Sequence, residues 1–281
     1  MALIIKLSIW FFCLLVIYFY GLSAVYAAAH VVERQNLFDW YYSAVFGTGA
    51  YRIGERDVFV ITVPFDKQLR AASEEKYEVM LRLPITAGFY DYKIEDIGDL
   101  EIPTDVATLT FFPGIYYVIP LFDNWTVKPF ANLGYGKEFE GGEEAWIYST
   151  GARILFKTHN NDWRYMFGSS FYYAGNTRES ETALGFLAFD ISADVGYKTS
   201  WQIDNEQIYV GGYVTAYYFS DLDFIQSDQT TIEINQQYEI GLTFSANKSI
   251  NLLGLDIERI GLGYLKSNAF YAWRLVFSFP Y

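Results

Sequence analysis

Apolar and polar side chains alternate along the chain after residue 30, in segments of about ten residues separated by turn residues. The stretch from residue 232 to 244 shows the pattern most clearly. One face of it would carry Ile232, Ile234, Tyr238, Ile240, Leu242 and Phe244, and the other Glu233, Asn235, Gln237, Glu239, Gly241 and Thr243. A helix would scatter both sets round its circumference, whereas a strand separates them completely. The pattern therefore predicts β-strands.

Twelve such segments are predicted, near residues 41–50, 55–65, 76–91, 104–118, 124–136, 145–157, 162–174, 183–198, 206–219, 231–245, 256–266 and 270–281. No apolar run after residue 30 approaches the roughly 20 residues that a membrane helix needs. A soluble β-sandwich also alternates. However, these segments are long, aromatic residues gather at their ends, and their polar faces carry glycine and charges of both signs, which suits a wet lumen. We therefore expect an all-β protein, a single antiparallel transmembrane β-barrel of outer-membrane type with about 12 strands.

The predicted connections alternate in length. Tight turns are expected at residues 122–124, 158–162 and 202–206, and mostly longer, acidic loops at 93–104, 137–144, 176–182 and 220–230. Membrane barrels have short periplasmic turns and long outer loops, so both termini are expected in the periplasm. The connections at 67–76 and 266–268 do not fit this alternation.

The last segment carries an apolar or aromatic residue at every second position up to the final residue. It resembles the C-terminal signal that the outer-membrane barrel assembly machinery reads, with Trp273, Leu275, Phe277, Phe279 and Tyr281 as the signal residues. Three positions depart from that signal: Tyr281 replaces the commoner Phe, Pro280 precedes it, and Val276 stands where Gly is frequent. Proline is tolerated at a strand end.

Residues 1–29 read as a signal peptide. Lys6 supplies a cationic start, an apolar stretch follows, and small residues near Ala27 and Ala29 offer cleavage after either position. Residues 30–281 would then form the barrel. An uncleaved anchor is the alternative, because the apolar stretch is long for a signal peptide.

Composition narrows the functional classes. Aromatic residues make up 20% of the chain, which suits the aromatic girdles of a membrane barrel. The net charge of −13 argues against binding nucleic acid, because no basic stripe can neutralise phosphates. The one cysteine, Cys13, lies in the leader, so the mature chain would have no disulfide and no thiolate metal site. We expect a monomer in contact with outer-membrane lipid and lipopolysaccharide, without a cofactor.

The candidate chemistry is sparse. A lipase-type or protease-type barrel enzyme needs a histidine beside a nucleophile or paired acids. The two histidines are His30, beside the cleavage sites, and His159, on a predicted periplasmic turn, so neither catalytic nor metal-binding residues are predicted. Charged residues on the polar faces could instead form a lumen network, namely Arg82, Lys128, Arg153, Asp190, Asp194, Glu233, Glu239, Arg259 and Arg274. That network would either set ion selectivity or hold the wall rigid and fill the interior.

A series of short motifs resembles the solitary outer-membrane autotransporter β-barrel family. They are residues 81–88 (LRLPITAG), 112–115 (FPGI), 119–121 (IPL), 124–125 (NW) and 129–130 (PF). The resemblance implies an autotransporter-type barrel without a passenger and without an established activity. It favours a non-enzymatic translocator, small pore or structural surface protein over a barrel enzyme or a loop-presenting adhesin. Whether the lumen is open or plugged stays undecided by the sequence.

Overall fold

The computed structural model describes residues 47–53, 56–72, 77–90, 107–139, 144–178, 184–203, 205–220, 223–225, 231–252, 255–268 and 270–277. The predicted signal peptide, its cleavage sites and most of the first predicted strand lie outside these residues. Within them the regular structure consists of β-strands, and no helix is long and apolar enough to cross a membrane.

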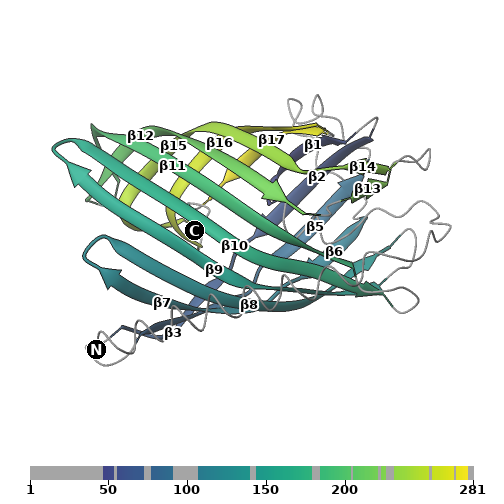
Figure 1. Ribbon diagram of the computed structural model, residues 1–281. Coiled ribbons are helices and arrows are strands. Elements are labelled where there is room, and N and C mark those ends of the chain that lie inside the picture. Colours follow the sequence, from purple (N-terminus) through teal and green to yellow (C-terminus); the bar gives the residue numbers. More distant parts are fainter. Residues whose placement is uncertain are drawn as a thin grey trace. The chain divides into compact units, whose positions relative to one another are not determined.

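The strand segments are β1 (Gly49–Ile53), β2 (Arg56–Val63), β3 (Asp66–Arg70), β4 (Glu78–Arg82), β5 (Ile85–Tyr90), β6 (Thr108–Phe111), β7 (Gly114–Phe122), β8 (Trp125–Glu138), β9 (Glu144–Asn160), β10 (Trp163–Arg178), β11 (Leu184–Ile203), β12 (Glu206–Phe219), β13 (Asp223–Ile225), β14 (Thr231–Glu233), β15 (Gln236–Leu252), β16 (Leu255–Ser267) and β17 (Phe270–Val276). All except β13 and β14 belong to one antiparallel sheet, in which β17 pairs with β1 and so closes the barrel (Figure 1). Three pairs of consecutive segments are single strands with a short interruption, so the described residues form a closed barrel of 12 strands. The predicted fold and strand count are confirmed.

Proline residues interrupt three neighbouring strands. Two of these strands were predicted as continuous, near 76–91 and 104–118. The third was predicted to end near residue 65, so β3 corrects the connection that was predicted at 67–76. Pro64 lies between β2 and β3, Pro84 between β4 and β5, and Pro113 between β6 and β7. The Phe112 N–H donates to the Pro84 carbonyl at 3.2 Å, so neighbouring interruptions lie side by side. Proline has no N–H to give to the sheet, which explains why the hydrogen-bond ladder breaks at this level.

The segment predicted as one strand over residues 231–245 is in fact two. β14 pairs with β13, and the wall strand β15 begins only at Gln236. Ile234 lies between them with 0% of its surface exposed, so the expectation that it shares the outward face of Tyr238 is wrong. Its side chain joins an apolar cluster instead, because leaving the strand there buries it more fully than a place on the outer face would.

Two of the predicted tight turns are confirmed by their backbone. Asn161 and Asn205 have φ values of 55° and 65°, the left-handed region that asparagine tolerates better than most residues. They connect β9 to β10 and β11 to β12, and we call this end of the barrel the short-turn end. The opposite end, which we call the long-loop end, carries the connection between β5 and β6 and that between β12 and β15.

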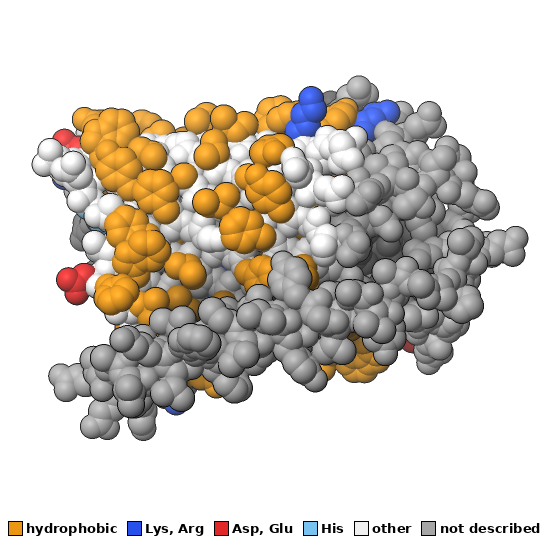
Figure 2. Space-filling model, viewed as in Figure 1, with side chains coloured by type: hydrophobic (Ala, Val, Ile, Leu, Met, Phe, Trp, Pro, Cys, Tyr) orange, Lys and Arg blue, Asp and Glu red, His pale blue; other side chains and the backbone are white. Residues whose placement is uncertain are grey.

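The two faces of the wall differ as the alternation predicts. On β15, Ile240 and Leu242 are 62% and 68% exposed, whereas the intervening Gly241 and the flanking Glu239 and Thr243 face inward. Figure 2 shows hydrophobic side chains spread over the described part of the outer wall. At the C-terminus, Trp273 and Leu275 of β17 point outward, and Phe277 follows the strand; Phe279 and Tyr281 lie outside the described residues.

Candidate functional site

The barrel lumen contains several buried charged side chains in the described part of the chain. Of the predicted lumen charges, Asp190, Asp194, Glu239 and Arg259 are between 0% and 5% exposed. Glu233 lies in β14, outside the barrel sheet, and its side chain is not among those described. The remaining predicted residues are Arg82 on β4, Lys128 on β8, Arg153 on β9 and Arg274 on β17.

Glu239 is the centre of one cluster. The Arg274 guanidinium forms an ion pair with its Oε2 at 2.6 Å, and the side chains of the two residues are 16% and 2% exposed. The hydroxyls of Tyr213 and Tyr217 donate to the same carboxylate at 2.6 and 2.9 Å. Gly263 leaves the necessary room, since a Cβ there would lie 2.6 Å from Glu239 Oε1. Both oxygens of this buried carboxylate are therefore satisfied, as burial of a charge requires.

Asp194 is the centre of a second cluster, nearer the short-turn end. Arg259 places two nitrogens 3.0 Å from Asp194 Oδ2, and the Thr243 hydroxyl donates to the same oxygen at 3.3 Å. The Arg259 guanidinium also lies 4.6 Å from the centre of the Tyr213 ring, which extends from the first cluster. Asp194 is on β11 and Arg259 on β16, so this contact spans the lumen past β12 and β15.

The wall formed by β4, β8 and β9 carries cations. Arg82 pairs with Asp66 at 3.2 Å, and the Arg153 guanidinium lies 4.7 Å from the centre of the Phe130 ring. Asp190, on β11, accepts a short hydrogen bond from Ser170. The structure thus separates the predicted charges into an acidic side with its own arginines and a side that is mainly basic.

An apolar cluster occupies the lumen at the long-loop end. It joins residues from eight of the wall segments and one connection: Tyr51, Val58, Val60, Ile147, Ala174, Phe186, Ala188, Phe219, Ile234, Leu265, Phe270 and Ala272. The Phe186 and Phe219 rings meet edge to face, with centroids 5.8 Å apart. Because these residues lie near the strand ends that carry the long loops, the cluster lies beyond the Glu239 cluster along the barrel axis.

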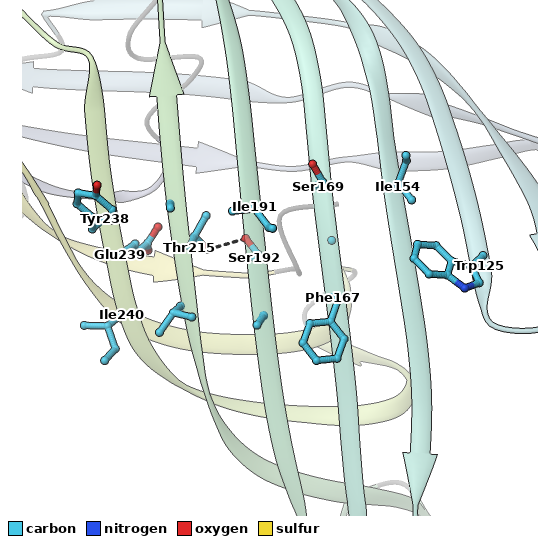
Figure 3. Close-up of a pocket in the computed structure, with 14 residues that line it drawn as sticks. Trp125, Ile154, Phe167, Ser169, Ile191, Ser192, Thr215, Tyr238, Glu239 and Ile240 are labelled. Carbon is cyan, nitrogen blue, oxygen red and sulfur yellow. Dashed lines mark hydrogen bonds between the residues drawn. The ribbon is translucent and has the colours of Figure 1, made fainter. Parts of the chain in front are cut away.

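The outer wall has a groove of about 800 Å³ (Figure 3). Small side chains, Ser169, Ala193 and Ala216, form its floor. Larger apolar side chains form its sides, namely Trp125, Ile154, Phe167, Ile191, Val214, Tyr238 and Ile240. The Ser169 hydroxyl donates to the Asp190 carbonyl at 2.9 Å, so this polar group on the floor is already satisfied.

Of the two histidines, only His159 is among the described residues. His159 lies on β9, one residue before its end and not in the turn itself, and its ring is 6.3 Å from that of Tyr209. His30 is outside the described residues. Among the described side chains, no group of three or more His, Cys, Asp or Glu residues could hold a metal ion.

Three buried lumen residues were not predicted from the sequence. Tyr213 and Tyr217 alternate with Thr215 on the inward face of β12, and this alternation was the available signal. Arg164 is the second residue of β10 and is only 6% exposed, and its position beside a turn gives no sign of this burial in the sequence.

No protein-family model matches this chain, and neither does any curated protein. Among solved structures, the β-domain of the Bordetella autotransporter BrkA matches with a TM-score of 0.52 over 83% of this chain and 96% of that one, at 11% sequence identity. The chain has the fold of an autotransporter β-domain. The resemblance noted in the motifs is thus confirmed for the autotransporter-type barrel, whereas membership of the solitary family remains a prediction.

Proposed function

We propose that this autotransporter-type barrel is a non-enzymatic outer-membrane protein whose lumen is closed at rest, so that it serves as a structural surface protein and not as an open pore. An autotransporter-type barrel points to the bacterial outer membrane. The observation that carries the proposal is the stack of side-chain layers in the lumen: the apolar cluster, the Glu239 cluster and the Asp194 cluster.

Each layer joins strands that are not neighbours in the sheet. Arg274 reaches from β17 to β15, and Arg259 from β16 to β11. The members are nearly inaccessible to solvent, with Asp194 at 0% and Arg259 at 2% exposure. Water-filled porin lumens keep such charges hydrated, so this degree of burial favours a filled interior.

The outer face of the barrel is suited to contact with membrane lipid. Its groove presents apolar side chains and no unsatisfied hydroxyl on its floor, which suits the hydrocarbon chains of outer-membrane lipid or lipopolysaccharide. We extend the proposal to assembly by the outer-membrane barrel machinery, for which the outward-facing Trp273 and Leu275 would supply part of the signal. The protein can remain a monomer, because lipid and not a partner protein would cover its apolar outer surface.

Planar-bilayer recording of the refolded protein tests the closed lumen. We expect no stable conductance steps from the unmodified chain, and steps from a variant in which Glu239→Ala and Arg274→Ala remove the central ion pair. Stable steps from the unmodified chain would contradict the proposal and favour a small pore. Silence from both proteins, with correct folding, would show that other layers seal the lumen, which still supports the closed state.

A barrel enzyme is the second candidate and has its own test. Hydrolysis of phospholipid, lipopolysaccharide or peptide panels by the folded protein, lost in His159→Ala, would overturn the non-enzymatic assignment.

Deletion of residues 139–143 tests the adhesin alternative, because a loop-presenting adhesin would lose cell binding while the barrel stays folded.

A further inference from the structure

Three cations line one side of the lumen, and we call Arg82, Lys128 and Arg153 the cationic wall. Lys128 of β8 and Arg153 of β9 are directly opposite each other in the ladder. Both face the lumen, because Phe130, two residues from Lys128, is 9% exposed, whereas Ile154, next to Arg153, is 41% exposed on the outer face. Like charges directly opposite on one face of a sheet repel. The cationic wall therefore carries a structural cost.

The described acids close to this wall do not neutralise all of it. Arg82 pairs with Asp66 at 3.2 Å. Asp190 of β11 attracts Arg153, but Ser170 of β10 lies between the two in the sheet and donates a short hydrogen bond to Asp190. Arg153 itself takes part in no ion pair among the described residues, and its described contact is with a ring. A guanidinium on the lumen side is thus left with donors for an anion.

Water reaches the cationic wall, and the positive charge continues toward the short-turn end. Lys128 is the fourth residue of β8, which begins directly after the turn at residues 123–124. Lys128 and Arg153 are both partly exposed, and the Arg82 side chain is 29% exposed. Lys157, four residues closer to the end of β9 than Arg153, adds a cation that is 48% exposed. A dissolved anion would therefore approach the wall along a positively charged path.

We propose that Lys128 and Arg153 form a binding site for an oxyanion of the phosphate class, with Arg82 adding positive charge beside it. The Arg153 guanidinium lies over the Phe130 ring, 4.7 Å from its centre. A ring contact occupies the face of a guanidinium and leaves the N–H donors in its plane, where two phosphate oxygens accept together. The Lys128 ammonium supplies a compact second charge. A phosphate between the two side chains would remove the cost of their repulsion.

This site goes beyond the proposed structural role and does not depend on it. An anion can occupy the cationic wall from the short-turn end in a sealed barrel or in a conducting one, so bilayer recording and the binding experiment test different claims.

Charge-selective cysteine labelling measures the electrostatic potential at the wall. Cys13 is the only cysteine, so a Cys13→Ser chain with Thr126→Cys carries a single reporter, two residues from Lys128 on the same face of β8. Two methanethiosulfonate reagents, one with a sulfonate and one with a trimethylammonium group, are added to folded protein in nonionic micelles without phosphate. The ratio of the anionic to the cationic rate should fall about fivefold in Arg153→Gln, because a unit charge about 8 Å away in water acts with opposite sign on the two reagents.

Lys137→Gln is the matched control, since Lys137 is an exposed cation near the other end of β8. It should leave the ratio unchanged. Equal ratios in the parent and in Arg153→Gln would overturn the proposal. Lys128→Gln should lower the ratio as well, and it replaces Arg153→Gln if that variant fails to fold.

Inorganic phosphate is the probe for binding. At twice its dissociation constant, phosphate should slow the anionic reagent at Thr126→Cys about threefold, whereas chloride at equal ionic strength should not. Arg153→Gln should lose this protection. Arg153→Lys should keep the rate ratio but lose most of the protection, because it retains the charge without the paired donors. A preference for the anionic reagent without protection by phosphate would show a positive potential only and overturn the site.

A second arm identifies the source of the phosphate group. Short-chain phosphatidic acid is added to the micelles in place of inorganic phosphate. Protection by inorganic phosphate assigns the site to a soluble anion, and protection by phosphatidic acid alone assigns it to a lipid headgroup. Protection by neither would overturn the site.

Discussion

The Glu239 carboxylate gives the sharpest stability prediction. Glu239→Ala leaves the Arg274 guanidinium in the lumen without its 2.6 Å partner and removes the acceptor of two tyrosine hydroxyls. Loss of one partner from a buried ion pair costs about 3–5 kcal/mol. Because the Arg274 side chain keeps 16% of its surface exposed, water can partly solvate it and the low end applies, about 3 kcal/mol. With a urea m-value of about 2 kcal/mol/M, the unfolding midpoint should fall by about 1.5 M.

Urea titration of the refolded barrel in phospholipid vesicles, followed by tryptophan emission, measures this shift. Glu239→Gln should lose less, because its amide oxygen still accepts from a tyrosine. The double variant Glu239→Ala with Arg274→Met should be more stable than Glu239→Ala alone, since it removes the uncompensated charge. Glu144→Gln, whose carboxylate is at the surface in a 2.8 Å pair with Lys137, is the matched control and should not move the midpoint measurably. Equal midpoints for Glu239→Ala and Glu144→Gln would refute the reasoning.

Three further predictions use the same titration. Gly263→Ala should destabilise the barrel by about 1–3 kcal/mol, because its Cβ would push Tyr213 away from Glu239, whereas Gly212→Ala, whose Cβ has 3.4 Å to the nearest atom, should be tolerated; equal effects would contradict this. Asn205→Ala should cost about 1 kcal/mol at a φ of 65°, and Asn205→Gly should cost less; the reverse order would exclude backbone strain as the cause. Leu242→Arg, at a position 68% exposed on the outer face, should cost about 2–4 kcal/mol in vesicles if it lies near the bilayer centre; an unchanged midpoint would place β15 away from lipid.

The wall of the barrel could be predicted from the sequence because a two-residue period is a local property. Glu239 and Leu242 differ in environment through their position in the alternation, and this requires no knowledge of neighbouring strands. The tight turns were predictable for the same reason, since asparagine at positions 161 and 205 tolerates the left-handed backbone.

The filling of the lumen could not be predicted in this way. Whether Arg259 reaches Asp194 depends on how far apart β16 and β11 lie across the interior, which alternation does not encode. β15 continues past residue 245, where the predicted strand ends, to Leu252 across a bulge at residues 246–249, and this continuation depends on pairing with β16 and not on local alternation. Prolines 64, 84 and 113 could have marked the interruptions, but their alignment at one level appears only once the strands are in register.

Surface labelling of intact cells tests most directly whether this chain is an outer-membrane barrel with its long loops outside. Single cysteines replace Glu144, beside the connection from β8 to β9 at the long-loop end, and Asp162, in the turn from β9 to β10 at the short-turn end. With a membrane-impermeant maleimide, Glu144→Cys should react on intact cells, and Asp162→Cys only after the outer membrane is permeabilised. Labelling of Asp162→Cys on intact cells, or of neither residue there, would contradict the proposed place and orientation of the barrel.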